Sequence, residues 1–202
     1  LKTARKGIVT FPLRVRGVAA PSGVDFAAGA SAIVELARQI ERIAALTDLQ
    51  RGTTLNPGVI RGGTRTNVIA AEAEAEIDLR VTRMRDAAAV ERKLRALRPV
   101  DPRCTLEWSG GMNRPPMERS SGVVRLFRTA QALARKHLGL ILEESSTGGG
   151  SDGNFTAGLG IPTLDGIGAV GEGAHAPHES ILENRIADRT ALLALLTRAL
   201  GQ

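Results

Sequence analysis

The segment from Val68 to Val81 constrains the fold more than any other part of this 202-residue chain. Apolar and charged side chains alternate without a fault from residue 71 to 81, in the order AEAEAEIDLRV. Successive side chains of a β-strand point to opposite faces, so this period of two predicts a long strand. One face of that strand lies in a core, and the other faces solvent or a partner.

The neighbouring segments predict the rest of a domain. Alternation and helical spacing of apolar residues place strands over Ile8–Arg16, Thr53–Ile60, Val68–Val81 and Cys104–Trp108, with helices over Ser31–Leu46 and residues 86–98. The order β-α-β-β-α-β is the ferredoxin-like, split-βαβ plan. Residues 109–116 replace periodicity with turn formers and prolines, so we place the domain boundary there and assign residues 6–116 to this domain.

Two details of this domain are further predictions. Pro12 favours an edge or bulged position for its strand, because proline cannot donate a hydrogen bond to a β-ladder. Asp86 is the predicted N-cap of the second helix, and Pro99 ends that helix.

Residues 117–202 predict α/β layering instead. The expected elements are helices over Ser121–Leu138, Asp152–Leu159 and Asn184–Leu200, with buried strands over Leu140–Leu142 and Ile161–Leu164. Such short strands make a poor sheet. We therefore expect this piece to be the C-terminal part of a larger domain whose N-terminal part lies outside this chain.

Composition excludes several classes of protein. Lys and Arg exceed Asp and Glu by 27 to 21, but the four Phe, one Trp and no Tyr cannot build the stacking surfaces of RNA and single-strand binders. The arginines are scattered, which is typical of a solvated surface, so we expect no nucleic-acid partner. The single Cys104 excludes an internal disulfide framework.

No uncharged apolar run approaches the roughly 18 residues of a membrane span, so no membrane partner is expected. The chain starts at Leu1 and shows no leader. The location of the whole protein stays open, with the cytoplasm as the default.

Three Gly-rich polar segments are candidates for chemistry: residues 61–67, 147–154 and 171–179. The second precedes a helix, so it could hold an anion, or it could be a tight turn capped by Ser151 or Asp152. The third places His175 and His178 beside Glu172 and Glu179, which are donors that suit zinc, although loop histidines are often plain surface residues. Spacing alone leaves both alternatives open.

Three longer segments carry a resemblance. They read GVDFAAGASAIVELA, LNPGVIRGGTRTNVIAAEAEAEIDLRV and TGGGSDGNFTAGLGIPTLDGIGAVGEGAHAPHESI. They resemble the C-terminal half of the dinuclear-zinc metallopeptidases that include glutamate carboxypeptidase, acetylornithine deacetylase, succinyl-diaminopimelate desuccinylase and aminoacylase, and the glutamate carboxypeptidase branch most of all. The resemblance implies that residues 6–116 are the lid, through which the family forms homodimers. It implies that residues 117–202 end the catalytic domain.

Four residues take roles from this resemblance. His175 matches the terminal zinc ligand, and Gly150 matches a position that lines the substrate pocket. Asn67 and Arg80 match lid residues that approach substrate, and Arg80 suits a bidentate grip on a terminal carboxylate. The implied substrate is a small N-acyl amino acid or peptide with a terminal carboxylate. Two zinc ions per subunit would activate a bridging water and polarise the scissile carbonyl.

Two departures limit this transfer. The other zinc ligands and the catalytic base of the family precede its lid, so this chain carries one of five ligands and no base. We therefore expect no tightly bound zinc and no activity in the isolated chain. In addition, Pro21 stands where the family has a lid histidine that stabilises the oxyanion in the neighbouring protomer. The alternative interpretation is thus a catalytically lapsed relative that acts as a homodimerising interaction module.

Overall fold

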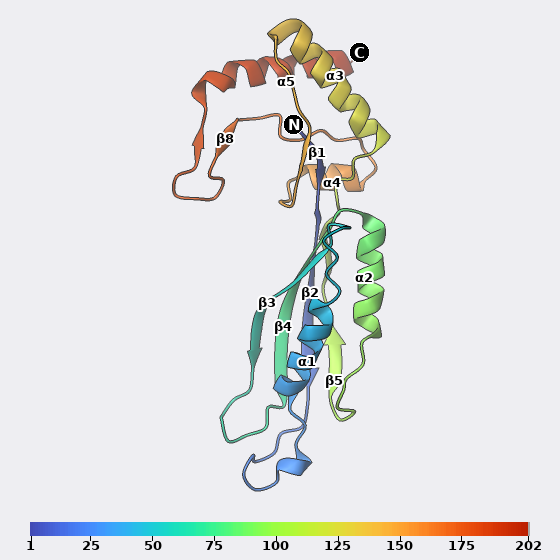
Figure 1. The fold of residues 1–202 in the computed structure, drawn as a ribbon, viewed down its shortest axis with the longest axis vertical. Helices are drawn as coiled ribbons and strands as arrows, with labels where there is room; N and C mark the ends of the chain where they lie inside the picture. Colours follow the sequence, from blue (N-terminus) through green and yellow to red (C-terminus); the bar gives the residue numbers. More distant parts are fainter. Residues whose placement is uncertain (202) are drawn as a thin grey trace. The chain divides into compact units, whose positions relative to one another are not determined.

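The computed structural model describes residues 1–201, which form two compact units (Figure 1). The first unit comprises Lys6–Pro116. The second unit comprises the residues from Met117 onward together with Leu1–Arg5. The chain therefore enters the second unit twice, once at each end of the sequence.

The first unit is an antiparallel five-stranded sheet with two helices. Its strands follow the order β3-β4-β2-β5, and β6 also pairs with β2, on the same side as β5. The elements are β2 Gly7–Arg16, the 3₁₀ helix η1 Phe26–Ala28, α1 Ala32–Ala44, β3 Thr54–Gly62, β4 Glu72–Val81, α2 Met84–Ala96, β5 Thr105–Trp108 and β6 Gly111–Arg114. The predicted ferredoxin-like plan is confirmed, with β6 as an addition.

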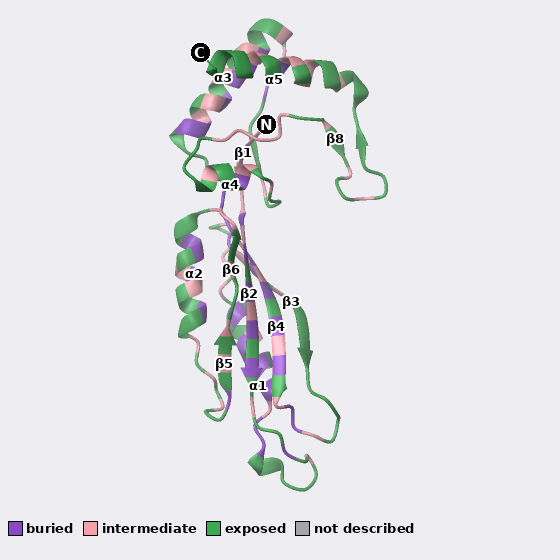
Figure 2. Ribbon diagram, turned by 180° about the vertical axis from the view of Figure 1, so that it is seen from behind, coloured by how far each residue is buried: buried purple, intermediate pink, exposed green. Residues whose placement is uncertain are grey.

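The core of the first unit lies between the sheet and the two helices. Ala75, Ile77, Leu79 and the other apolar residues of β4 are at most 3% exposed, and purple and non-purple residues alternate along β2 and β4 in Figure 2. On the helix side, Leu36 and Ile43 are fully buried. Burying one such side chain contributes about 1.5–3 kcal/mol, so the alternation fixes which face of β4 meets the helices.

The sequence predicts an edge or bulged strand at Pro12, and the edge alternative is wrong. β2 lies inside the sheet, with β4 on one side and β5 and β6 on the other. The Pro12 carbonyl accepts a hydrogen bond from Ser109 N (3.1 Å), so its missing N–H also faces the junction between β5 and β6. There Gly110 adopts φ = +78° against Thr10 and Pro12. The neighbouring strand, not β2, is interrupted to accommodate the proline.

Three local predictions also need correction. Arg83, not Asp86, occupies the N-cap of α2, and Asp86 lies in the first turn, 3.6 Å from Arg51 as an ion pair. The expected boundary loop contains β6, which pairs with β2. No alternation of apolar residues in the sequence predicts this strand. β4 begins at Glu72 rather than Val68, because the preceding backbone pairs with the segment that follows β2 instead of with β3.

The second unit combines small ladders with helices. Its elements are β1 Lys2–Arg5, α3 Ser121–Leu138, β7 Ser145–Thr147, α4 Gly153–Gly158, β8 Gly171–Glu172, β9 Ser180–Ile181, the 3₁₀ helix η2 Glu183–Arg185 and α5 Ile186–Leu200. β1 pairs in parallel with β7, and β8 pairs with β9 as a hairpin. Phe127, Ala130 and Ala134 of α3 pack with Leu192 and Leu196 of α5.

The strands predicted over Leu140–Leu142 and Ile161–Leu164 are absent from the described residues. Leu142 is buried in the α3–α5 cluster, and its carbonyl accepts a hydrogen bond from Gln131 Nε2 (3.0 Å). The ladder forms three residues later, where the chain's own N-terminal segment supplies the partner. Short apolar runs do not distinguish a strand from a segment packed against helices.

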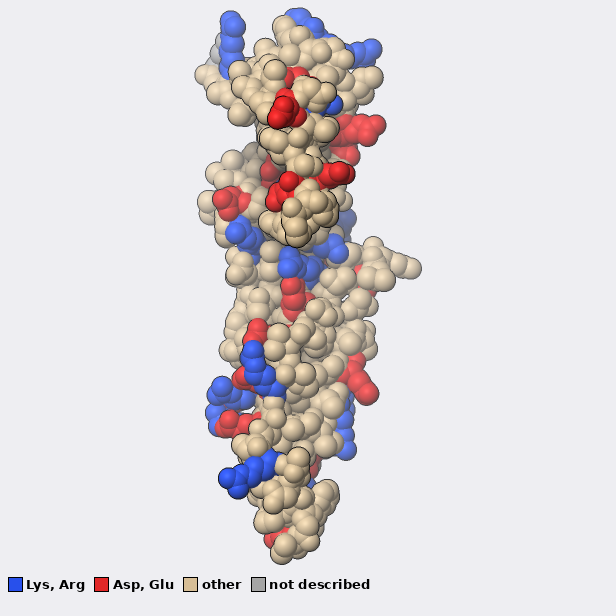
Figure 3. Space-filling view, turned by 90° about the vertical axis from the view of Figure 1, so that its left-hand side faces the viewer, with Lys and Arg blue, Asp and Glu red and all other residues tan. Residues whose placement is uncertain are grey.

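Charged residues of both signs are interspersed over the face that Figure 3 shows. This agrees with the expected solvated surface. None of the helices formed by residues 1–201 has both the length and the apolar character that crossing a bilayer requires.

Candidate functional site

Arg80 lies near the C-terminal end of β4, on the polar face of the sheet. Its Nε and Nη2 atoms each lie 2.7 Å from an oxygen of Asp78, which forms a bidentate ion pair. The hydrogen bonds that Arg80 donates to Asp78 raise the pKa of Arg80, and the Arg80 side chain is 31% exposed. The guanidinium thus already binds a carboxylate in the fork geometry that a substrate carboxylate would need. The strand period explains the pair, because residues two apart share a face.

Asn67 lies in the exposed loop between β3 and β4. Its carbonyl accepts a hydrogen bond from Ser22 N (3.0 Å), and Pro21 pairs with Val68 as an isolated β-bridge. Asn67 and Pro21 are both exposed. The structure therefore brings the predicted substrate residue Asn67 together with Pro21, where the resemblance predicts a histidine.

The structure does not bring Asn67 and Arg80 together within one chain. β4 begins after the Asn67 loop, and Arg80 lies eight residues beyond its first residue, Glu72. At about 3.3 Å per residue the two ends are roughly 26 Å apart. A small substrate that contacts both residues would need them from two different copies of the chain.

Gly150 lies in an exposed turn between β7 and α4. The Gly149 carbonyl accepts a hydrogen bond from Arg5 (2.9 Å), and Ser151 hydrogen-bonds to Asp165. Ser151 Oγ also accepts from Gly153 N at 3.1 Å. This part of the turn is thus occupied by internal hydrogen bonds, and α4 is only six residues long. The geometry favours the tight turn over the anion site, with Ser151 Oγ as the acceptor for the Gly153 amide.

His175 lies in the loop of the β8–β9 hairpin. It is exposed and is the only non-glycine residue among those described with a positive φ, at +67°. Its backbone N–H donates to Glu179 Oε2 (3.2 Å). A strained backbone at a candidate site is an observation that favours function, because the strain has to be stabilised by its surroundings.

Across residues 1–201, no group of three or more His, Cys, Asp or Glu side chains is placed to hold a metal ion. A zinc ion needs three or four protein ligands. His178 packs over Gly173, where an added Cβ would lie 2.8 Å from His178 Cδ2.

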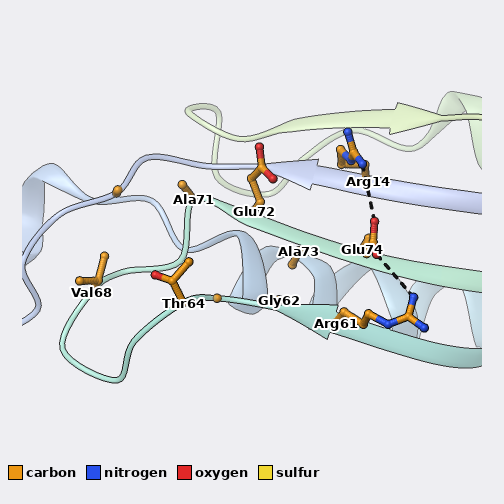
Figure 4. A pocket seen from close by; sticks show the side chains of 11 residues that line it. Arg14, Arg61, Gly62, Thr64, Val68, Ala71, Glu72, Ala73 and Glu74 are labelled. Atoms are coloured by element: carbon orange, nitrogen blue, oxygen red, sulfur yellow. Dashed lines mark ion pairs between the residues drawn. The ribbon is translucent and has the colours of Figure 1, made fainter.

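Sequence reasoning missed a hollow on the polar face of the first unit's sheet. Figure 4 shows Glu74 between Arg14 and Arg61, at 3.8 and 3.6 Å, along one wall of a cavity of about 530 Å³. Small residues such as Gly62 and Ala73 also line it. The alternation in β4 already placed Glu74 on this face, but nothing in the sequence indicated the hollow.

Comparison with known proteins identifies relatives of this chain. Residues 3–99 match the M20_dimer family model, described as "Peptidase dimerisation domain". The chain carries a dimerisation domain of the M20 peptidase family. This family is generally zinc-dependent, and the predicted resemblance is confirmed.

Individual M20 relatives match the chain almost from end to end. It is 26% identical to carboxypeptidase G2 of Pseudomonas sp. (strain RS-16) over 100% of this chain and 49% of that protein. It is 29% identical to succinyl-diaminopimelate desuccinylase of Stenotrophomonas maltophilia (strain R551-3), over 98% of this chain and 52% of the relative. The crystal structure of aminopeptidase PepT from Bacillus cereus ATCC 10987 superposes with a TM-score of 0.79 at 25% identity, covering 99% of this chain and 53% of PepT. The chain thus spans about half the length of these relatives.

Proposed function

We propose that this chain is the lid and the C-terminal catalytic segment of a zinc-dependent amide hydrolase of the glutamate carboxypeptidase type. The observation that carries the proposal is the match to carboxypeptidase G2 over the whole chain. In this proposal residues 6–116 are the lid, and residues 117–202 end a catalytic domain. We call the protein that also contains the N-terminal part of that domain the complete enzyme.

Each candidate residue has a role in the complete enzyme. His175 supplies one zinc ligand, and the remaining ligands of two zinc ions come from the N-terminal part. Arg80 binds the terminal carboxylate of an N-acyl amino acid or small peptide, for which it must release Asp78. Gly150 lines the substrate pocket. Asn67 approaches the substrate of the neighbouring protomer, as its separation from Arg80 requires.

The isolated 202-residue chain should bind almost no zinc and hydrolyse no N-acylglutamate. A single candidate ligand cannot hold zinc tightly, because structural and catalytic sites use three or four. Equilibrium dialysis with elemental analysis measures the stoichiometry, and amide hydrolysis is assayed with and without added zinc. One or two tightly bound zinc ions per chain, or metal-dependent turnover that purifies with the chain, would contradict the fragment interpretation. The complete enzyme serves as the positive control.

The homodimer is proposed to form through the lid. Strand β3 ends the sheet and pairs only with β4 within the described chain, so its other backbone edge is available to a second copy. Two of its side chains, Val59 and Ile60, are 38% and 57% exposed. Ile33 of α1 is 41% exposed and lies beside the end of β3, at Gly62. An open strand edge beside exposed apolar residues is typical of a pairing surface.

Ile60→Lys should shift the dimer of the 202-residue chain to monomer, weakening association at least tenfold. The introduced ammonium group would have to be buried or repelled at the pairing edge. Light scattering coupled to size-exclusion chromatography measures the mass over a range of concentrations. Val100→Lys is the matched control, because Val100 is 43% exposed in the same unit but outside β3. Equal effects of the two lysines would exclude the β3 edge.

The second candidate function is a catalytically lapsed, homodimerising interaction module. Pro21 favours it, because proline has no N–H or side-chain donor to replace the histidine of the family. Both candidates form dimers, so only hydrolysis by the complete enzyme distinguishes them.

A further inference from the structure

We propose that Asp165 is a positioning residue for the Gly-rich turn of residues 147–153, holding it in the arrangement in which it meets substrate. The substrate part of this inference rests on the proposed function, through the role given to Gly150. The structural part rests only on contacts within the second unit.

The carboxylate of Asp165 joins three separate pieces of the second unit. Arg5 Nε of β1 lies 2.6 Å from Asp165 Oδ2. Ser151 Oγ in the turn donates to the same oxygen. Gly166 N donates to Oδ1 at 2.6 Å. One side chain thus connects the start of the chain, the Gly-rich turn and the segment that leads toward the β8–β9 hairpin.

Gly150 is held from both sides through this carboxylate. On one side, the Arg5 guanidinium that pairs with Asp165 also donates from Nη1 to the Gly149 carbonyl (2.9 Å). On the other side, Ser151 is bonded to Asp165 directly. The residue between these two anchors cannot change its backbone direction without breaking one of them. A glycine has more conformational freedom than any other residue, so a turn with three consecutive glycines needs such anchors to keep one shape.

The turn also packs closely against Asp165. A Cβ added to Gly153 would lie 3.1 Å from Asp165 Oδ2 and 3.3 Å from Ser151 Oγ. Ser151 N donates to Oδ1 of Asn154, which is fully buried (2.9 Å). The anchors therefore continue into α4, and the turn is fixed to a packed element.

The Arg5–Asp165 pair is shielded from solvent, with side chains 16% and 25% exposed. Burial alone raises the pKa of Asp165, but hydrogen bonds from Ser151, Gly166 N and Arg5 outweigh it, and the pKa lies below its usual value. The carboxyl group is therefore ionised at neutral pH and accepts all of these bonds. Removing one partner of a shielded, hydrogen-bonded pair destabilises the fold more than removing one partner of an exposed surface pair.

The first test measures amide hydrogen exchange by NMR in the 202-residue chain. Asp165→Asn keeps the shape but removes the charge, and it should speed exchange of the Ser151 and Gly153 amides about tenfold. Arg5→Lys keeps the positive charge but loses the guanidinium group, and it should also speed exchange of these two amides. Glu143→Gln removes an exposed carboxylate of the same unit and serves as the control. Unchanged exchange in both Asp165→Asn and Arg5→Lys overturns the inference.

The second test separates positioning from general stability in the complete enzyme. Asp165→Asn and Ser151→Ala should raise KM about tenfold with kcat, per active site titrated, within about twofold. Ser151→Thr keeps the hydroxyl and should restore KM. A loss of folded protein alone would lower the number of active sites without moving KM, and that result overturns the substrate role of Asp165. A complete enzyme that hydrolyses no substrate overturns the proposed function instead, while the exchange rates decide on Asp165 independently.

Discussion

Pro21→His in the complete enzyme should raise kcat/KM for amide hydrolysis by about 100- to 1000-fold. One oxyanion donor typically contributes that much to the rate, and the resemblance places a histidine donor at this position. Proline offers no hydrogen to a developing oxyanion. Steady-state kinetics with an N-acylglutamate substrate, at equal zinc occupancy, measures the change.

The structure can accept this substitution. Pro21 is exposed, and its contribution to the local turn is a carbonyl that accepts from Asp25 N at 3.2 Å, which any residue would supply. Pro21→Ala is therefore the matched control, since it removes the ring without adding a donor. If the histidine and alanine variants hydrolyse substrate equally, then either the position does not face the oxyanion or another donor already serves there. Inactivity of the histidine variant in a zinc-loaded complete enzyme would favour the lapsed interaction module.

The fold of the first unit could be predicted because its pattern is local. Alternation in β4 and helical spacing in α1 each identify an element without reference to the rest of the chain. The edge prediction for Pro12 failed because proline only lacks one N–H in a strand. Here the neighbouring strand is interrupted at Gly110, opposite that missing donor. That compensation depends on a residue about a hundred positions away, which no local pattern reveals.

The second unit was harder to predict because its pairings join residues that are far apart in the sequence. The partner of β7 is β1, about 140 residues earlier, and three polar residues such as Ser145–Thr147 carry no strand period. The Asp165 cluster likewise joins residues 5, 151 and 165, which no spacing rule connects. The Arg80–Asp78 pair is the exception, because two charges of opposite sign two residues apart on a strand already share a face.

The candidate site was found through resemblance rather than through spacing. His175 and His178 look alike in the sequence, and only the structure distinguishes His175 by its positive φ. Asn67 precedes β4 and Arg80 lies near its C-terminal end, so a small substrate that contacts both residues would need a second copy of the chain. In the proposed function, the residues that complete the metal centre lie outside these 202 residues, so no pattern within them could predict that part.

Glu35→Ala should destabilise the first unit by about 2–4 kcal/mol. Glu35 lies on α1 and is 1% exposed, and both oxygens of its carboxylate accept hydrogen bonds. Val100 N and Asp101 N donate to its two oxygens at 2.9 and 3.0 Å, and Gln39 Nε2 donates at 2.6 Å. Truncation removes the acceptor of both backbone amides, and Gln39 Nε2 keeps only the Arg98 carbonyl at 3.1 Å. Each of these groups that stays unsatisfied costs about 1–3 kcal/mol. It also releases the segment after α2 from α1.

Urea unfolding followed by Trp108 fluorescence measures this change, because the single tryptophan of the chain reports the first unit alone. Glu41→Ala, at an exposed position of the same helix, should stay within about 0.5 kcal/mol of the parent chain. Equal stability of the two variants would contradict the role of Glu35.

The pH dependence provides an independent check on the charge of Glu35. Burial raises its pKa, but the hydrogen bonds from Asp101 N, Gln39 and Val100 N outweigh that effect, so the folded pKa lies below the ordinary value of 4.5. A group with a depressed folded pKa contributes its full stability above the unfolded pKa and loses it as the pH falls through the folded pKa. The difference between the parent chain and Glu35→Ala should therefore be constant above about pH 5.5 and shrink as the pH falls below 4.5. A difference that persists unchanged at low pH would mean that packing, and not the ionised carboxylate, holds the segment after α2 against α1.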